Sequence, residues 1–161
     1  MQKEIVLSDR AMNIRKQLPA TIELVWEAWT KPDEIGNWWG PAGFTNAIQK
    51  MELAPDGEWL LTMFGPDGKR FPNKSIFREI VLYKKIFFQH FNPNYLATVL
   101  FEPKEDKTLL DWTMEFETKE LFEIVVHTFK ADEGLQQSVA KLENYLLQKI
   151  SSVQEGSRLP G

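Results

Sequence analysis

Few side chains in this sequence could do acid–base or metal chemistry. The histidines His90 and His127 lie far apart in no metal-site spacing, and lone histidines of this kind more often have a structural role. Glu79 follows Phe77 by two residues, so on a strand both side chains share one face. Glu79 is therefore the best candidate for an inward-facing carboxylate, whose pKa burial would raise and which could act as an acid or a base.

No partner for such a carboxylate is visible in the sequence. It contains no Gly-rich phosphate loop, no Ser–His–Asp arrangement and no metal-binding motif. The absence of Cys excludes disulfides, thiolate zinc sites and thiol nucleophiles. We therefore expect no recognisable catalytic residue, no cofactor and no metal, although enzymatic activity as such stays open.

Large rings are the more informative feature. Aromatic residues make up 12 % of the chain, with 6 Trp and 11 Phe, which is enough to fill a core and still line a pocket. The adjacent Trp38 and Trp39 run into Gly40-Pro41-Ala42-Gly43, and neighbouring side chains on a strand or helix point in different directions. Either both rings pack in the core, or one packs while the other borders a cavity with 40–43 as its rim.

Periodicity and turn signals predict the elements that would position these rings. Thr21 offers an N-cap for a first helix, Pro32 starts a second short helix through Trp38, and two Pro-Asp-Gly turns divide a three-stranded meander. From Asp132, a plausible N-cap, Leu135, Val139, Leu142 and Leu146 repeat in steps of 4, 3 and 4. The predicted strands span 11–18, 44–83 (three strands), 85–91, 95–102 and 110–117, and 121–129 is helical or irregular.

These elements have a simple packing solution. An antiparallel sheet with one apolar face, clearest in the alternation of residues 110–117, can curve around a long helix with one apolar stripe. The sequence predicts a single α+β domain over residues 1–150, with six to seven strands, followed by a flexible tail over 151–161. If rings line one end of the curved sheet without filling it, a cavity results.

Four segments carry a resemblance to a known family. They are LVWEAWTKPDEIGNWWGPAGFTN, PDGEW, GPDGKRFPN and EGLQQSVAKLENYLL, in that order. Together they resemble the activator of heat-shock-protein-90 ATPase homologue family, within the START-like (SRPBCC, birch-allergen-like) superfamily, over residues 11–149. The resemblance implies a helix-grip fold with an internal cavity between the sheet and the C-terminal helix. The superfamily includes lipid carriers, metabolite binders, cyclases and co-chaperone domains involved in stress responses, so a fold of this kind does not fix a function.

A curved sheet cannot cover all its inward rings with one helix, so a subset should line the cavity, and Met suits adaptable binding. The candidate ligand-binding residues are Trp38, Trp39, Trp59, Met63, Phe77, Glu79, Phe88, Trp112, Met114, Phe129 and Leu135.

Three functions follow, in order of preference. The first is binding of a small hydrophobic or aromatic molecule, in which case Trp112→Ala should weaken binding more than folding. The second is an enzyme acting on a hydrophobic substrate through Glu79 or His90. The third is a co-chaperone-like module with a chaperone or another protein as partner; in the eukaryotic co-chaperone a separate N-terminal domain makes that contact, and 161 residues predict one domain only.

Composition narrows the partners and the location further. A net charge of -4 disfavours nucleic acid as a partner. The charged start MQKEIVLSDR is unlike a signal peptide, and no window approaches a membrane span, so a cytoplasmic protein is the default expectation.

Overall fold

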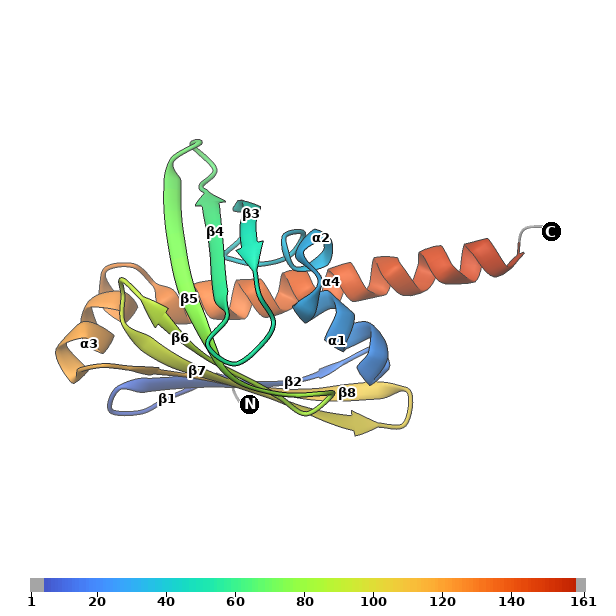
Figure 1. Ribbon diagram of the computed structural model, residues 1–161, viewed down its shortest axis with the longest axis horizontal. Helices are drawn as coiled ribbons and strands as arrows, with labels where there is room; N and C mark the ends of the chain where they lie inside the picture. Colours follow the sequence, from blue (N-terminus) through green and yellow to red (C-terminus); the bar gives the residue numbers. More distant parts are fainter. Residues whose placement is uncertain (1–4, 159–161) are drawn as a thin grey trace.

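The structure is a computed structural model that describes residues 5–158, and one curved antiparallel sheet dominates it (Figure 1). Eight strands in this part of the chain form the sheet in the order β1-β2-β8-β7-β6-β5-β4-β3. The fold is α+β of the helix-grip type, as predicted. The strands are β1 Ile5–Leu7, β2 Ala11–Leu18, β3 Thr45–Met51, β4 Glu58–Phe64, β5 Arg70–Val81, β6 Lys85–Phe91, β7 Tyr95–Lys104 and β8 Lys107–Phe116.

The strand count exceeds the predicted six to seven because β1 was missed. This strand is three residues long and pairs only with β2, and Ile5 is its one buried residue. A strand that short carries too few residues to show a period. The predicted three-stranded meander, the strand over 85–91 and the alternation in β8 are all confirmed, with Leu110, Trp112 and Phe116 buried.

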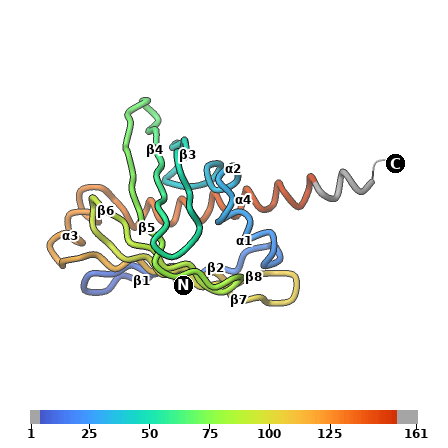
Figure 2. The backbone as a smooth tube through the Cα atoms, viewed as in Figure 1, coloured from blue at the N-terminus to red at the C-terminus, as the bar shows by residue number. Residues whose placement is uncertain are grey.

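Within residues 5–158, four helices lie on the concave side and at the ends of the sheet: α1 Ile22–Thr30, α2 Pro32–Ile35, α3 Lys119–His127 and α4 Ala131–Arg158. Figure 2 traces α4 across the opening of the curved sheet, with α1 and α2 at one end and α3 at the other. The predicted stripe of Leu135, Val139, Leu142 and Leu146 is buried against the sheet. The sheet therefore grips one helix face.

Some predicted helix boundaries differ from the structure. Thr21 occupies the N-cap of α1 but its side chain makes no capping bond, and α2 ends at Ile35, three residues earlier than expected. The segment after α2 still coils, since the amides of Trp38 and Trp39 both donate to the carbonyl of Ile35.

The segment predicted to be a tail from residue 151 is helical as far as Arg158. It continues α4 without a break and projects beyond the sheet (Figure 1). A helix satisfies its own backbone groups and can continue without an apolar stripe once packing has nucleated it. Residues 159–161 of that predicted tail lie outside the described residues.

Candidate functional site: a ring-lined cavity under α4

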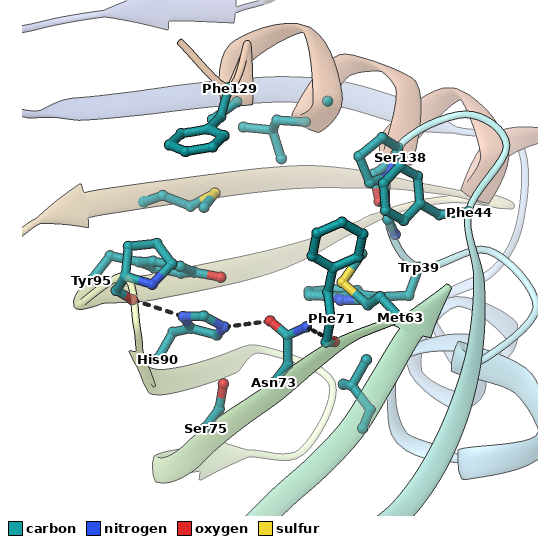
Figure 3. Close-up of a pocket in the computed structure, with 18 of the residues that line it drawn as sticks. Trp39, Phe44, Met63, Phe71, Asn73, Ser75, His90, Tyr95, Phe129 and Ser138 are labelled. Atoms are coloured by element: carbon teal, nitrogen blue, oxygen red, sulfur yellow. Dashed lines mark hydrogen bonds between the residues drawn. The ribbon is translucent and has the colours of Figure 1, made fainter. Parts of the chain in front are cut away.

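A cavity of about 490 Å³ lies between the concave face of the sheet, the segment 39–44 and the first turns of α4 (Figure 3). Its lining is mostly rings and aliphatic groups, and it falls within the range of sites that bind small molecules. The lining residues are Trp39, Gly40, Pro41, Phe44, Trp59, Leu61, Met63, Arg70, Phe71, Pro72, Asn73, Ser75, His90, Asn92, Pro93, Tyr95, Trp112, Met114, Phe129, Lys130, Ala131, Gly134, Leu135 and Ser138.

The adjacent tryptophans divide their roles. Trp38 is fully buried and its Nε1 donates to the carbonyl oxygen of Ala28 at 2.9 Å, which fixes it in the core beneath α1. Trp39 lines the cavity, where its ring stacks on Trp112 with centroids 5.4 Å apart and meets Trp59 edge-on at 4.9 Å. One ring packs and the other borders the cavity, which is the second of the two interpretations of this pair.

The rim after Trp39 is held down by α4. The Lys141 Nζ lies 3.4, 3.3, 3.1 and 3.1 Å from the carbonyl oxygens of Trp39, Gly40, Pro41 and Phe44, which share its three N–H groups. Burial lowers the pKa of Lys141. The Trp39 oxygen also accepts from Asn46 Nδ2 at 2.8 Å and the Pro41 oxygen accepts from the Phe44 amide at 3.1 Å. A single cation thus adds to these bonds and draws the carbonyls of the turn toward α4.

Two further hydrogen bonds and two glycines fit the rim to its surroundings. The Gly40 amide donates to Ser138 Oγ at 3.2 Å and the Ala42 amide donates to Gln137 Oε1 at 3.0 Å. Gly40 has a φ of +95°, and a Cβ there would come within 2.6 Å of Met63 Cε. A Cβ at Gly134 would lie 3.2 Å from Pro41, so α4 and the rim approach closely at this point.

Seven of the eleven predicted ligand-binding residues line this cavity, and four do not. The seven are Trp39, Trp59, Met63, Trp112, Met114, Phe129 and Leu135. Trp38, Phe77 and Phe88 are buried core residues outside the lining. The fourth, Glu79, faces away from the interior.

The prediction that Glu79 points inward is wrong because β5 contains a β-bulge. The register with β6 shifts between Phe77 and Glu79, so Arg78 is an extra residue and the alternation of faces restarts. The Arg78 guanidinium bonds Asp56 in the first Pro-Asp-Gly turn at 2.9 Å, which holds the bulge in place. The Glu79 side chain is 50 % exposed and forms an ion pair with Lys85 at 2.5 Å.

The sequence did not reveal the polar part of the lining. Ser75 and His90 are register partners on β5 and β6, and His90 and Tyr95 are register partners on β6 and β7. Asn73 precedes Ser75 by two residues and also lines the cavity. Figure 3 shows these four side chains together on the sheet side, facing Phe129 across the cavity. Only their register could have placed them together.

The His90 ring is held at both nitrogens. Its Nδ1 lies 2.8 Å from the carbonyl oxygen of Pro93 and its Nε2 lies 2.7 Å from Asn73 Oδ1, while Asn73 Nδ2 donates to the carbonyl oxygen of Phe71 at 2.9 Å. Tyr95 stacks on one face of the ring, with centroids 4.6 Å apart. Burial lowers the pKa of His90, and the contact with Pro93 opposes this in part.

Among the described residues that line the cavity, the charged groups are all cationic. Arg70 and Lys130 are exposed side chains at the mouth, and no Asp or Glu occurs in the lining. Elsewhere in the described part of the chain, no three His, Asp or Glu side chains gather closely enough to hold a metal ion. The geometry of the site would suit a small molecule with an apolar body, packed against the rings, and one polar end, hydrogen-bonded by the polar side chains of the sheet.

A sheet that grips a long helix over a cavity defines the helix-grip class, and sequence comparison gives the family within it. The family described as "Activator of Hsp90 ATPase homolog 1-like protein" matches residues 19–147, so the chain belongs to that family. This agrees with the resemblance found in the sequence. No functionally curated protein matches the chain.

Solved structures show the same fold. A protein from Arthrobacter aurescens superposes with a TM-score of 0.85 at 21 % identity, covering 89 % of this chain and 91 % of its own. A Nitrosomonas europaea protein gives 0.79 at 20 % identity over 91 % and 99 % of the two chains. An AHSA1-like protein from Aeromonas hydrophila gives 0.70 at 22 % identity over 86 % and 94 %. At these identities the likeness concerns the fold alone.

Within residues 5–158, no helix is both long enough and apolar enough to cross a membrane.

Proposed function

We propose that the chain binds a small hydrophobic or aromatic molecule in the cavity between the sheet and α4. The observation that carries this proposal is the cavity of about 490 Å³ that three tryptophans line and that no side chain fills. The space opens to solvent at its mouth, and a concave site of this size with mostly apolar walls is the kind that binds small molecules. Met63 and Met114 in the lining suit an adaptable fit.

Native mass spectrometry of the gently purified protein, compared with the denatured mass, tests the proposal directly. We expect an excess mass that disappears on denaturation and identifies the ligand class. A bare mass, together with no thermal shift across a library of apolar compounds, would overturn the proposal.

A variant at the mouth separates binding from folding. Phe129 lines the cavity and is 71 % exposed, so Phe129→Ala should leave stability within about 0.5 kcal/mol while weakening ligand binding. Ile124 on α3 is half exposed and outside the lining, so Ile124→Ala is the matched control and should bind normally. Equal affinity in both variants would argue against ligand entry at this mouth.

A co-chaperone-like role is the second candidate, and the family description favours it because it names activation of the Hsp90 ATPase. The test is the ATPase rate of a purified Hsp90-type chaperone with and without this protein. Stimulation that saturates with added protein supports the role. An unchanged rate, with no co-sedimentation of the two proteins, counts against it. The enzyme hypothesis loses Glu79, which lies outside the cavity.

A further inference from the structure

The polar strip on the cavity wall is a continuous row across three strands. Ser75, His90 and Tyr95 are direct register partners on β5, β6 and β7, and side chains paired in this way on one face lie about 5 Å apart at Cβ. Trp59 pairs with Ser75 at one end of the row and Phe116 pairs with Tyr95 at the other. Three polar groups therefore sit between apolar neighbours, directly under the cavity.

The hydroxyls at either side of His90 have no partner in the described part of the chain. Ser75 is only 4 % exposed, yet its Oγ makes no hydrogen bond there, and neither does the Tyr95 hydroxyl. Both residues line the cavity, and Figure 3 shows the two oxygens directed toward it. Both hydroxyls are open to the cavity and free to donate, so a ligand oxygen placed there can accept a hydrogen bond from each.

The hydrogen-bond chain through His90 is complete only when the ring carries two protons. Carbonyl oxygens of Pro93 and Phe71 stand at its two ends and can only accept. A neutral ring has one N–H. If the proton is on Nε2, Nδ1 faces the Pro93 oxygen without a proton between them. If the proton is on Nδ1, the Asn73 amide must turn its NH₂ toward Nε2, and its oxygen then faces the carbonyl oxygen of Phe71. The imidazolium donates at both nitrogens and satisfies every contact.

Burial opposes that charged form in the empty cavity, and an anion beside the ring would offset the cost. No described residue that faces His90 supplies a negative charge. On β5 it faces Asn73 and Ser75, on the β7 side it faces Pro93 and the neutral Tyr95, and the ionised residues of the lining are the cations Arg70 and Lys130. The chain as a whole is acidic, at -4, so this cationic lining is local to the cavity.

We propose that the ligand is an apolar monocarboxylate whose carboxylate accepts hydrogen bonds from Ser75 and Tyr95 and pairs with a doubly protonated His90. The inference rests on the proposed function and names its ligand class. The apolar body lies among Trp39, Trp59 and Trp112, and one proton passes from solvent to His90 on binding. Arg70 and Lys130 attract the anion to the mouth.

Calorimetric titration with two matched probes tests the inference. The probes are para-phenylbenzoate and its neutral amide, para-phenylbenzamide, which share one apolar body. We expect the carboxylate to bind at least about tenfold more tightly than the amide near pH 6, with its affinity falling by up to about tenfold per pH unit above that. Repeating the titration in buffers of different ionisation enthalpy should show uptake of about one proton per carboxylate bound. Decanoate in a parallel titration tells an alkyl body from an aromatic one, and tight binding of either acid supports the carboxylate.

Variants test whether His90 takes up the proton and whether Ser75 and Tyr95 donate the hydrogen bonds. His90→Gln should abolish the proton uptake, and Tyr95→Phe and Ser75→Ala should each weaken the carboxylate about tenfold with little effect on the amide. Tyr83→Phe is the matched control, because Tyr83 lies in the turn between β5 and β6 outside the lining, and it should bind like the parent. Nitrogen NMR of His90 should show both ring nitrogens protonated in the complex.

The outcomes separate the two proposals. Equal affinity for acid and amide, without proton uptake, overturns the carboxylate assignment and leaves ligand binding intact. Failure of both acids to bind also overturns the assignment, and only a bare native mass together with a failed library screen overturns the proposed function as well.

Discussion

At the scale of single residues, His90 makes the stability of the empty protein depend on pH. Burial lowers the pKa of His90 below its value of 6.5 in an unfolded chain. Below pH 6.5 the unfolded chain therefore binds a proton that the folded protein does not. The stability from the neutral ring is fully present above that pH and is lost as the pH falls toward the folded pKa.

We expect the urea midpoint of the ligand-free protein to fall between about pH 7.5 and about pH 5.5, and His90→Gln to reduce that fall. The variant keeps an amide that can bond one of the two neighbours. A parent and variant with parallel pH profiles would show that other groups carry the acid sensitivity.

Glu79 gives a contrasting prediction at the same scale. Its carboxylate is half exposed on the outer face, and an exposed ion pair such as that with Lys85 contributes little. Glu79→Gln should change the free energy of unfolding by no more than about 0.5 kcal/mol and leave ligand affinity unchanged, as thermal unfolding and titration would show. Loss of ligand binding in this variant would mean that the Glu79 carboxylate lies in the cavity, and would contradict the outward position that the bulge gives it.

At the scale of elements, most of the architecture could be predicted, since the period of β8 and the stripe of α4 follow directly from which face is buried. The bulge in β5 could not be predicted from the alternation of faces along a strand, because that alternation assumes a strand without an extra residue and the bulge inserts one. The charged pair Arg78-Glu79, between the inward Phe77 and Ile80, does break the alternation and is the available signal. The polar row needed the pairing register, which depends on long-range contacts.

Lys141 on α4 holds the rim, so we expect its substitution to loosen the rim locally. Lys141→Met keeps the aliphatic stem but removes the cation from four carbonyl oxygens. The Trp39 oxygen keeps Asn46 Nδ2 as a donor and the Pro41 oxygen keeps the Phe44 amide, so the loss falls mainly on the oxygens of Gly40 and Phe44. We expect a loss of about 1.5–3 kcal/mol in urea unfolding, with faster amide exchange at Gly40 and Ala42. Lys119→Met is the control, because the one contact of Lys119 with the described residues is a long, exposed ion pair with Asp9. The stability of this variant should match that of the parent. Equal exchange in the two variants would mean that Ser138 and Gln137 hold the rim alone.

At the scale of the whole molecule, the cavity wall and the hydrophobic core are built from the same rings. Trp112 lines the cavity, is 3 % exposed, and also contacts Trp29 edge-on with centroids 4.9 Å apart, inside the core beneath α1. Trp39 stacks on it from the rim side. A helix-grip sheet has only one concave face, so that face both holds α4 and lines the cavity.

This sharing changes what Trp112→Ala should do. The sequence alone suggested that the substitution would weaken binding more than folding, whereas truncating a ring packed on two sides should lower the free energy of unfolding by about 3–5 kcal/mol. We expect a folded but much less stable protein, measured by urea unfolding, and stability that an apolar ligand partly restores because it occupies the enlarged space. A variant as stable as the parent would mean that Trp112 borders the cavity without supporting the core, and the two roles would then be separable at this position.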